Sequence, residues 1–441
     1  MKVCIVGAGD GGAIAANEIR RLNTEAQIDV FSRRTGLGCP PCPMPMVIGG
    51  AIAKWEDLIH GFRQNSFWEK RNIGIHLNTE VTSISREEKY IIAGGERYNY
   101  DKLILALGAT PIIPSFPGLD GKNEYSLSTD MADGVALWNV VDKYNEAAII
   151  GGGFIGLEIA QALKARGYRK VCLLVRRGVL RAHLDEDVAE KLVEVIEQNG
   201  VELILPAKIE GVDSSGTRKR VRLSDREFEV DFIFFATGAE PNVGLAREAG
   251  LQIGETGAIA VDQYLQTNDP DIYAVGDCME NWDVITDTRR RHQLAINSIR
   301  TGYLAGRNAV SGNSITYEGT VMPFVTKIFG HQIGAVGFTE REAREKGLDV
   351  VSVTVDTHWL RQRSNGCPTR YKLIADSKTK TLIGAQVFSG EIVSGTVDKL
   401  AVAIASRMPI IKLVQIDSCY SPQVQEDQLA APLHRLIDKL G

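Results

Sequence analysis

The sequence predicts an α/β protein with two doubly wound, Rossmann-like domains and a C-terminal α+β domain. Three observations lead to this fold class. An apolar run, a Gly-x-Gly-x-x-Gly turn and a helical pattern follow one another twice, at 2–22 and at 147–167. Two later apolar runs, at 103–111 and 232–241, both leave their strand at a glycine. From about residue 321 the pattern changes to successive strands with short turns.

The overall composition is that of an ordinary globular protein. Its 441 residues correspond to roughly two to four domains, and 44% of them are hydrophobic and 24% charged. A formal net charge of -5 gives no support for nucleic-acid binding. No apolar run is long enough to cross a bilayer, and the N-terminus lacks the layout of a signal peptide. We therefore expect a cytoplasmic protein that binds neither nucleic acid nor membranes.

The first glycine turn, GAGDGG, has the spacing of a dinucleotide-binding site. It follows a strand pattern and opens a helical one, which is the context that gives this motif its meaning. Gly7 permits the tight bend, Gly9 lets the backbone approach a diphosphate, and Gly12 lets the helix pack closely on the strand. The helix N-terminus then faces the phosphates.

The second glycine turn repeats this design in the same context. Gly151, Gly153 and Gly156 follow the apolar run AAII and precede another helical pattern. The repetition predicts two dinucleotide sites. For either turn alone, the alternative is a merely tight packing of a strand on a helix.

The acidic residue that usually binds a dinucleotide ribose is missing after the second strand of both units. In the first unit Ser32 stands there, followed by Arg33 and Arg34, and in the second Val175 is followed by Arg176 and Arg177. A carboxylate would repel a 2′-phosphate, whereas arginines accommodate one. The second unit therefore favours NADPH without excluding NADH. The alternative is that both arginine pairs are solvated loop residues.

The C-terminal part has a different pattern of hydrophobic and polar residues. Strand patterns occur at 326–337, 350–357, 371–377 and 381–390, and an amphipathic helical pattern follows at 391–407. These elements predict a separate α+β domain.

Seven cysteines are spread along the chain, an odd number that argues against a disulfide framework. Cys4 and Cys172 lie within apolar strands, where free cysteine packs as a small hydrophobe. Cys39 and Cys42 have only two prolines between them, and the chain has no second such pair, so we expect no metal site. Cys39 is then either a resolving thiol for Cys42 or a non-catalytic neighbour that the stiff connection holds apart.

Taken together, these features resemble the flavin-dependent pyridine nucleotide–disulfide oxidoreductases over nearly the whole chain. The match includes both glycine turns, the strand ends ALGATP and ATGAEP, the Gly-Asp pair at 276–277 and the C-terminal domain. The segment CPMPMVIGG, which begins at Cys42, resembles the single-cysteine branch of that family. This branch contains coenzyme A-disulfide reductases, NAD(P)H persulfide and polysulfide reductases, NADH oxidases and NADH peroxidases.

The resemblance implies three domains and a homodimer. Residues 1–115 and 248–320 would form a discontinuous FAD-binding domain, and 116–247 would form an NAD(P)H-binding domain. Residues 321–441 would form a dimerisation domain. The active site would be completed across the interface by Tyr420 of the partner subunit.

The resemblance also implies roles for individual residues. Cys42 would be the redox-active thiol, Glu158 would lie near the nicotinamide, and Asp277 would hold the ribityl chain of FAD. A helix N-terminus would point at the flavin pyrimidine, where its dipole favours the reduced ring. The further cofactor contacts lie at that helix start and at the two strand ends: Leu294, Ala295, Ala109 and Gly238.

The activity that the resemblance implies is FAD-dependent, NAD(P)H-driven reduction of sulfur–sulfur bonds in small thiols. Coenzyme A disulfide or coenzyme A persulfide is the expected acceptor. One alternative is an NADH oxidase or peroxidase, although those enzymes carry a histidine where this chain has Asp10. Another is a flavoprotein that passes electrons to a protein partner. The chemistry needs a thiolate at Cys42, and a helix N-terminus and the flavin could lower the pKa of that thiol.

Three other places bear on a coenzyme A substrate. Many coenzyme A-disulfide reductases have a second tyrosine where this chain has Gln362 and Arg363, which favours an anionic or persulfidic substrate over the symmetric disulfide. Arg20 and Arg21 are candidates for contact with a coenzyme A phosphate. The two remaining cysteines near the implied interface are not expected to be catalytic: Cys367 and Cys419.

Overall fold

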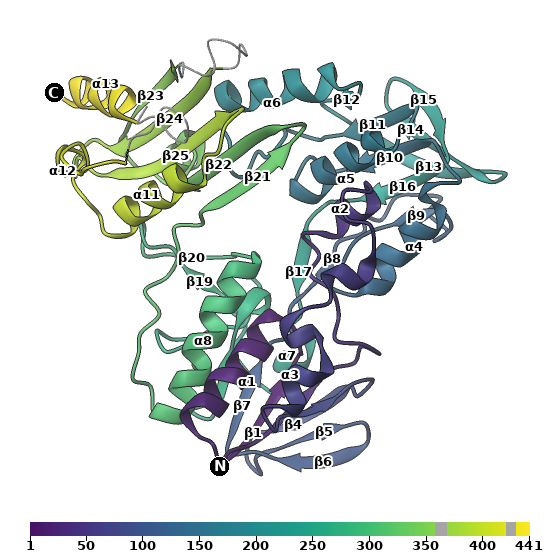
Figure 1. Ribbon diagram of the computed structural model, residues 1–441, viewed down its shortest axis with the longest axis vertical. Helices are drawn as coiled ribbons and strands as arrows, with labels where there is room; N and C mark the ends of the chain where they lie inside the picture. The colour runs from purple at the N-terminus through teal and green to yellow at the C-terminus, as the bar shows by residue number, and fades with distance from the viewer. Residues whose placement is uncertain (358–367, 420–428) are drawn as a thin grey trace.

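The computed structural model describes residues 1–357, 368–419 and 429–441. In these ranges the main elements are three five-stranded sheets. The N-terminal sheet lies in the lower part of Figure 1, the second sheet at the upper right and the C-terminal sheet at the upper left. The predicted fold class, two doubly wound domains plus a C-terminal α+β domain, is confirmed. The exact domain boundaries stay predictions.

The first sheet is entirely parallel, and its central strands are short and mostly buried. Helices α1 (Asp10–Leu22) and α8 (Ala295–Ser311) pack on each other beside it (Figure 1). A Cβ on Gly302 or Gly306 of α8 would lie only 2.3 or 2.6 Å from a main-chain oxygen of α1. The strand order is β18 (Ile272–Ala274), β7 (Lys102–Leu105), β1 (Lys2–Val6), β2 (Gln27–Phe31) and β3 (Gly74–His76).

Smaller elements surround this sheet. An antiparallel three-stranded sheet is formed by β4 (Val81–Ser85), β5 (Tyr90–Ala93) and β6 (Glu96–Asn99), and a hairpin by β19 (Asn281–Trp282) and β20 (Arg289–Arg290). The short helices are α3 (Asn65–Glu69) and α7 (Gly244–Glu248), with 3-10 turns η1 (Trp55–Leu58), η2 (Gly61–Arg63) and η3 (Gly276–Cys278).

The second sheet repeats the parallel design. Its order is β12 (Glu202–Ile204), β11 (Lys170–Leu174), β10 (Glu146–Ile150), β16 (Phe232–Phe235) and β9 (Glu124–Tyr125). Its helices are α4 (Met131–Val141), α5 (Phe154–Ala165) and α6 (Glu186–Gln198). An antiparallel sheet is added by β13 (Ile209–Ser215), β14 (Arg218–Leu223) and β15 (Glu227–Val230).

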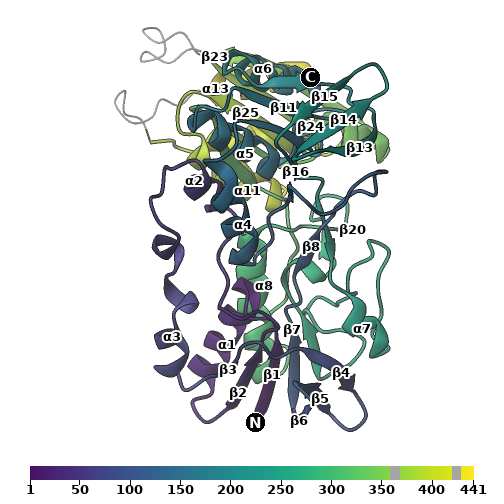
Figure 2. The same cartoon turned by 90° about the vertical axis from the view of Figure 1, so that its right-hand side faces the viewer.

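The two parallel regions are linked by a short antiparallel ribbon. β8 (Ala109–Pro111) pairs with β17 (Ala239–Pro241), so the two strand ends that look alike in the sequence lie side by side. The chain also crosses between the regions after β2. There α2 (Met44–Ile48) packs against α4 and α5, beside which it lies in Figure 2, and belongs to the core under the second sheet.

The C-terminal sheet is antiparallel, in the order β21 (Phe324–Ile328), β22 (His331–Gly337), β25 (Leu382–Ser389), β24 (Thr369–Asp376) and β23 (Val350–Thr357). The stretch at 326–337 holds the end of β21 and all of β22, because Gly330 makes the turn with φ +85°. The helices are α9 (Glu340–Glu345), α11 (Ser394–Ala405), α12 (Ile410–Leu413) and α13 (Ala430–Leu440). None of the helices in the described ranges combines the length and apolar character that a membrane crossing requires.

Candidate active site

A cavity of about 1600 Å³ is lined by elements of all three regions. Its walls include the first glycine turn, the end of β2, the N-termini of α5 and α8, and part of β21. Ten of the predicted site residues line it: Gly7, Gly9, Ser32, Arg33, Cys42, Ala109, Glu158, Asp277, Leu294 and Ala295. The fold thus brings together residues from distant parts of the sequence.

The three glycines of the first turn differ in their surroundings. Gly7 has φ +113°, and a Cβ there would lie 2.0 Å from the Ala106 oxygen. A Cβ on Gly12 would lie 1.9 Å from the Gly7 oxygen, so Gly12 serves the packing of α1 and does not line the cavity. A Cβ on Gly9 would meet nothing within 4 Å. This open space beside Gly9 fits a diphosphate approaching the backbone.

The second turn has the same geometry. Gly151 has φ +120° with a Cβ position 2.2 Å from the Ala236 oxygen, and a Cβ on Gly156 would lie 2.1 Å from the Gly151 oxygen. Gly153 again has open space around its Cβ position. This turn lies outside the cavity walls, as do Arg176, Arg177 and Gly238.

The residues that follow the second strands also differ. Ser32 is buried, and its hydroxyl accepts a hydrogen bond from the Arg34 backbone N–H at 3.2 Å. Arg176 and Arg177 are both exposed directly after β11. Within the described part of the chain neither arginine has an acidic partner. The two guanidinium groups are therefore free to meet an anion.

The helix starts at the cavity leave backbone donors available. α1 begins after Gly9 and α8 after Leu294, and neither N-cap residue accepts a capping hydrogen bond in its side chain. The first N–H groups of a helix have no partner within the helix, and the dipole makes this end favourable for negative charge. Both helix N-termini thus fit negatively charged groups such as the phosphates and the reduced ring of a flavin dinucleotide.

Asp277 lies in a tight 3-10 turn after β18. Its carboxyl group accepts a hydrogen bond from the Ser298 hydroxyl at 3.3 Å. Burial, and secondarily the charge of Asp10, raises the pKa of Asp277 to about 6. A half-buried carboxyl group at a cavity wall with one hydroxyl donor retains acceptor capacity, so it fits the hydroxyl groups of a ribityl chain.

Cys42 exposes its side chain at the cavity wall, immediately before α2. The predicted lowering of its pKa by a helix N-terminus is wrong for the protein alone. Although Cys42 is open to the cavity, the protein atoms around its thiol partly desolvate the thiolate and raise the pKa of Cys42, and the carboxylates of Glu158 and Asp10 raise this pKa further. α2 has only five residues, too few to supply a large opposing dipole.

Cys39 lies in a different environment. It is 2% exposed and belongs to the core that includes Met44 and Val47. Its thiol donates to the Pro40 oxygen at 3.6 Å, and burial raises its pKa. Neither Cys39 nor Cys42 forms a disulfide. These surroundings favour a packed neighbour over a resolving thiol.

Glu158 and Asp10 are held by neighbours that the sequence does not reveal. Thr326 of β21 donates its hydroxyl to Glu158 at 3.0 Å, and burial raises the pKa of Glu158. Arg63, whose side chain is 8% exposed, forms an ion pair with Asp10 at 2.9 Å. Both partners are distant in sequence, and no local motif marks either of them.

Other predicted residues lie apart from the cavity or outside the described ranges. Arg21 pairs with Glu18 at 2.7 Å, and Arg20 donates to the Asn72 oxygen at 2.7 Å. Cys419 is exposed and does not line the cavity. The predictions for four residues fall outside the described residues: Gln362, Arg363, Cys367 and Tyr420.

Comparisons with known proteins agree with this arrangement. The NADH oxidase of Methanocaldococcus jannaschii is 31% identical, with 96% of this chain and 95% of that protein covered. The NAD(P)H coenzyme A polysulfide/persulfide reductase of Pyrococcus horikoshii is 32% identical, with 96% and 94% covered. The solved NAD-dependent persulfide reductase from A. fulgidus superposes with a TM-score of 0.94 at 29% identity, with 100% of this chain and 83% of that one covered.

The family models cover most of the chain. The model described as pyridine nucleotide-disulphide oxidoreductase matches residues 1–302, and the model of that family's dimerisation domain matches residues 324–431. The chain therefore belongs to the pyridine nucleotide-disulphide oxidoreductases, a family of flavoproteins that bind FAD and NAD(P)H.

Proposed function

We propose that this protein is an FAD-dependent NAD(P)H reductase of sulfur–sulfur bonds in low-molecular-weight thiols. The observation that carries the proposal is the exposed thiol of Cys42 in a cavity that also contains Gly9, Asp277 and Glu158. The acceptor that we propose is coenzyme A persulfide or coenzyme A disulfide. The relative named as a coenzyme A polysulfide/persulfide reductase supports this choice.

The proposal assigns the cofactors to the two glycine turns. Residues 1–115 and 248–320 would hold FAD through Gly7, Gly9, Ser32, Arg33, Ala109, Asp277, Leu294 and Ala295. Residues 116–247 would hold NAD(P)H through Gly151, Gly153, Glu158, Arg176, Arg177 and Gly238. FAD, when bound, would accept a hydride from NAD(P)H and supply two electrons to the sulfur of Cys42.

Cys42 would carry the covalent chemistry. Its thiolate attacks one sulfur of R–S–S–R, forms a mixed disulfide and releases one thiolate, which takes up a proton. Two electrons then cleave the mixed disulfide, which restores the Cys42 thiolate and releases the second thiol. The sum is R–S–S–R plus NAD(P)H plus H⁺ giving two R–SH and NAD(P)⁺. A persulfide, R–S–SH, gives R–SH and H₂S by the same balance.

The ion pair between Asp10 and Arg63 bears on the alternative activities. In the single-cysteine branch that the sequence resembles, oxidases and peroxidases carry a histidine at the Asp10 position. Here that position holds Asp10, whose carboxylate binds the buried Arg63 guanidinium at 2.9 Å, so the imidazole of those enzymes is absent. This observation supports sulfur reduction over the reduction of oxygen or peroxide.

The proposal includes a homodimer. Residues 324–431 match a dimerisation domain, so we propose that Tyr420 of the partner subunit completes the site. All the cysteines in the described ranges are free, which fits the reducing cytoplasm that we propose as its location.

A direct assay separates the candidates. We expect purified holoenzyme to oxidise NAD(P)H under argon when coenzyme A persulfide or coenzyme A disulfide is added, with little oxygen uptake in air. Rapid oxygen consumption without any sulfur acceptor would contradict the proposal and favour an NADH oxidase, the name carried by the Methanocaldococcus relative. Slow turnover with every small acceptor and fast reduction of a protein would favour an electron-transfer subunit.

A further inference from the structure

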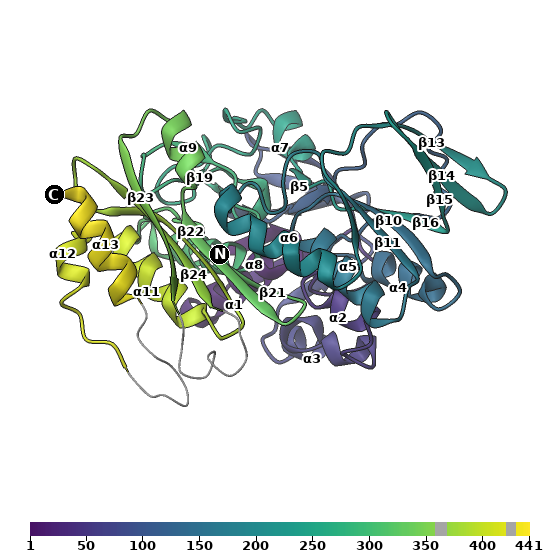
Figure 3. The same cartoon turned by 90° about the horizontal axis from the view of Figure 1, so that it is seen from above.

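The loop at 176–185 connects the proposed NAD(P)H site to the C-terminal sheet. It begins with Arg176 and Arg177 after β11 and ends at Asp185, directly before α6. From above, α6 lies between the second sheet and the C-terminal sheet (Figure 3). α6 also packs on β24 and β25 of the C-terminal sheet. One short segment therefore contacts the second glycine turn near its middle and the C-terminal domain at its end.

The middle of this loop is tied to the second glycine turn. The Leu180 N–H donates to the Gly152 oxygen at 2.8 Å. The His183 ring packs on Phe154, the first residue of α5, with ring centroids 5.1 Å apart, and on Phe324 of β21 at 4.8 Å. Burial lowers the pKa of His183 to about 4, so its ring is neutral at physiological pH. A displacement of this loop would therefore also displace the second glycine turn.

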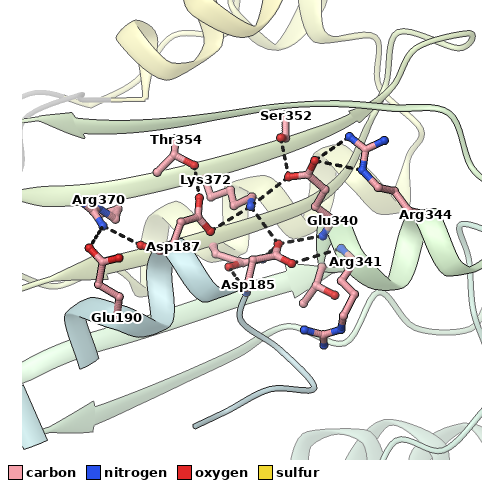
Figure 4. Close-up of polar contacts among 12 residues, drawn as sticks. Asp185, Asp187, Glu190, Glu340, Arg341, Arg344, Ser352, Thr354, Arg370 and Lys372 are labelled. Carbon is pink, nitrogen blue, oxygen red and sulfur yellow. Dashed lines mark hydrogen bonds and ion pairs between the residues drawn. The ribbon is translucent and has the colours of Figure 1, made fainter. Parts of the chain in front are cut away.

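The end of the loop is held by the C-terminal domain. The Asp185 carboxylate, whose side chain is 8% exposed, accepts the N–H groups of Glu340 and Arg341 at 2.8 and 3.2 Å. Gln386 of β25 donates its amide to the same carboxylate at 2.7 Å. The Asp185 main-chain N–H donates in return to the side-chain amide oxygen (Oε1) of Gln386 at 2.8 Å. Figure 4 shows the contacts of Asp185 with Glu340 and Arg341.

Lys372 of β24 supplies the positive charge at the centre of this cluster (Figure 4). Its side chain is 7% exposed, and its ammonium group lies 3.4 Å from Asp185, 3.0 Å from Asp187 and 3.0 Å from Glu340. Arg344 makes a second contact to Glu340 at 2.7 Å. A buried charge that loses its partner is strongly unfavourable, so these groups hold one another in a single arrangement.

We infer that Lys372 and Gln386, in the C-terminal domain, are positioning residues for NAD(P)H binding, because they fix Asp185 and through it the loop at 176–185. The inference rests on the proposed function, since it assigns NAD(P)H to the second glycine turn. In this arrangement the affinity for the nucleotide depends on a contact between domains and not only on residues that touch the ligand.

The test variant is Asp185→Asn in the FAD-loaded enzyme. The amide keeps the volume but turns an N–H₂ group toward donors, so the contacts with Glu340, Arg341 and Gln386 cannot all persist. The NAD(P)H concentration that half-saturates anaerobic flavin reduction should rise about tenfold, the size expected for lost charged hydrogen bonds. The limiting rate at saturation and the FAD content should stay within about twofold of the parent enzyme.

The chain offers a matched control in Glu124→Gln. Glu124 accepts the N–H groups of Asp120 and Gly121 at 3.1 and 3.0 Å and binds the buried Lys219 ammonium at 2.6 Å. It lies in the second sheet, and these partners are outside the loop at 176–185. Both Asp185→Asn and Glu124→Gln should lower the melting temperature, because each disturbs a cluster around a buried lysine. Only Asp185→Asn should raise the half-saturating NAD(P)H concentration.

A second variant keeps the inference falsifiable if Asp185→Asn does not fold. Gln386→Met removes both hydrogen bonds to Asp185 at nearly constant volume and should also raise the half-saturating concentration. An unchanged value in the variants that fold, or an equal rise in Glu124→Gln, overturns the inference. If neither NADH nor NADPH reduces the flavin of the parent enzyme, the proposed function itself fails, which is a distinct result.

Discussion

The two glycine turns have the same backbone design and face different neighbours. In both, the first glycine has a positive φ near +115°, the third is pressed against the first, and the second borders open space. The first turn opens on the cavity that contains Cys42, and its helix packs on α8. The second turn is bonded to a loop that the C-terminal domain holds. We infer from this difference that the motif supplies a backbone suited to a dinucleotide, whereas the elements packed around it decide which half of the proposed reaction it serves.

This comparison divides the proposed reaction into two halves. The second turn would deliver the reductant, and the first would direct electrons to sulfur. Substitutions that affect one half-reaction should leave the other half-reaction intact.

The largest effect is expected from Cys42→Ser. A serine hydroxyl cannot form the mixed disulfide, so turnover with coenzyme A persulfide or disulfide should fall by at least ~10³-fold. Anaerobic bleaching of the flavin by NAD(P)H should remain, because the nucleotide half is untouched. Stopped-flow absorbance measures the bleaching, and steady-state assays measure the turnover. Retained turnover would contradict the assignment of Cys42 as the redox-active thiol.

The neighbouring cysteine is the control. Cys39→Ala removes a buried sulfur from the core and should cost about 1–2 kcal/mol of unfolding free energy, with turnover within about twofold of the parent. Denaturant unfolding and the same assay are sufficient. A collapse of turnover in a well-folded Cys39→Ala protein would instead identify a resolving thiol.

The second largest effect is expected from alanine substitutions at Gly9 and Gly153, which test the two glycine turns separately. Gly9 and Gly153 have φ of -77° and -85°, so alanine is tolerated by the backbone at both positions. The added methyl would occupy the space where we place a diphosphate. Gly9→Ala should lower FAD content and affinity by roughly tenfold or more, whereas Gly153→Ala should keep FAD and raise the KM for NAD(P)H by a similar factor.

Absorbance of the purified proteins and titration of the apoprotein with FAD give the first quantity, and initial rates give the second. Equal loss of FAD in both variants would show that the two turns do not serve separate nucleotides.

The third effect concerns the choice of nucleotide. Replacing Arg176 and Arg177 together by alanine removes two exposed guanidinium groups that have no acidic partner among the described residues. The KM for NADPH should rise about tenfold while that for NADH changes little, because only NADPH carries the 2′-phosphate. If the parent enzyme uses both nucleotides and the variant changes neither KM, the arginines are solvated loop residues.

The smallest effect is a pH shift. Burial and the charges of Glu158 and Asp10 raise the pKa of Cys42, so the fraction of thiolate and the rate of the sulfur half-reaction should increase with pH. Asp10→Asn removes one of those negative charges and should move the rising limb toward lower pH by a few tenths of a unit. The pH dependence of kcat/KM for the sulfur acceptor checks the direction, and a shift toward higher pH would contradict it.

Several features could be predicted because they depend on short stretches of chain. The roles of Gly7, Gly9 and Gly12 depend on a bend and a contact within six residues, and the structure has the same geometry at the second turn. Most strands of the C-terminal sheet could also be predicted, because alternation and turn residues act locally, although the single pattern at 326–337 proved to hold the end of β21 and all of β22. A helix N-terminus does not lower the Cys42 pKa in the protein alone, because that pKa depends on how much protein surrounds the thiol and on carboxylates from α1 and α5. The effect of a bound flavin on this pKa stays a prediction.

The sequence by itself determined the two nucleotide turns, the order of the domains and the position of a cysteine suited to redox chemistry. Only the tertiary structure decided that Cys42 opens on the cavity while Cys39 is buried, and that Arg63 binds Asp10. It alone placed Lys372 and Gln386 on Asp185, nearly half the chain away. The reason is physical: a turn is fixed by the allowed dihedral angles of its own residues, whereas burial and ion pairing are fixed by which surfaces pack together.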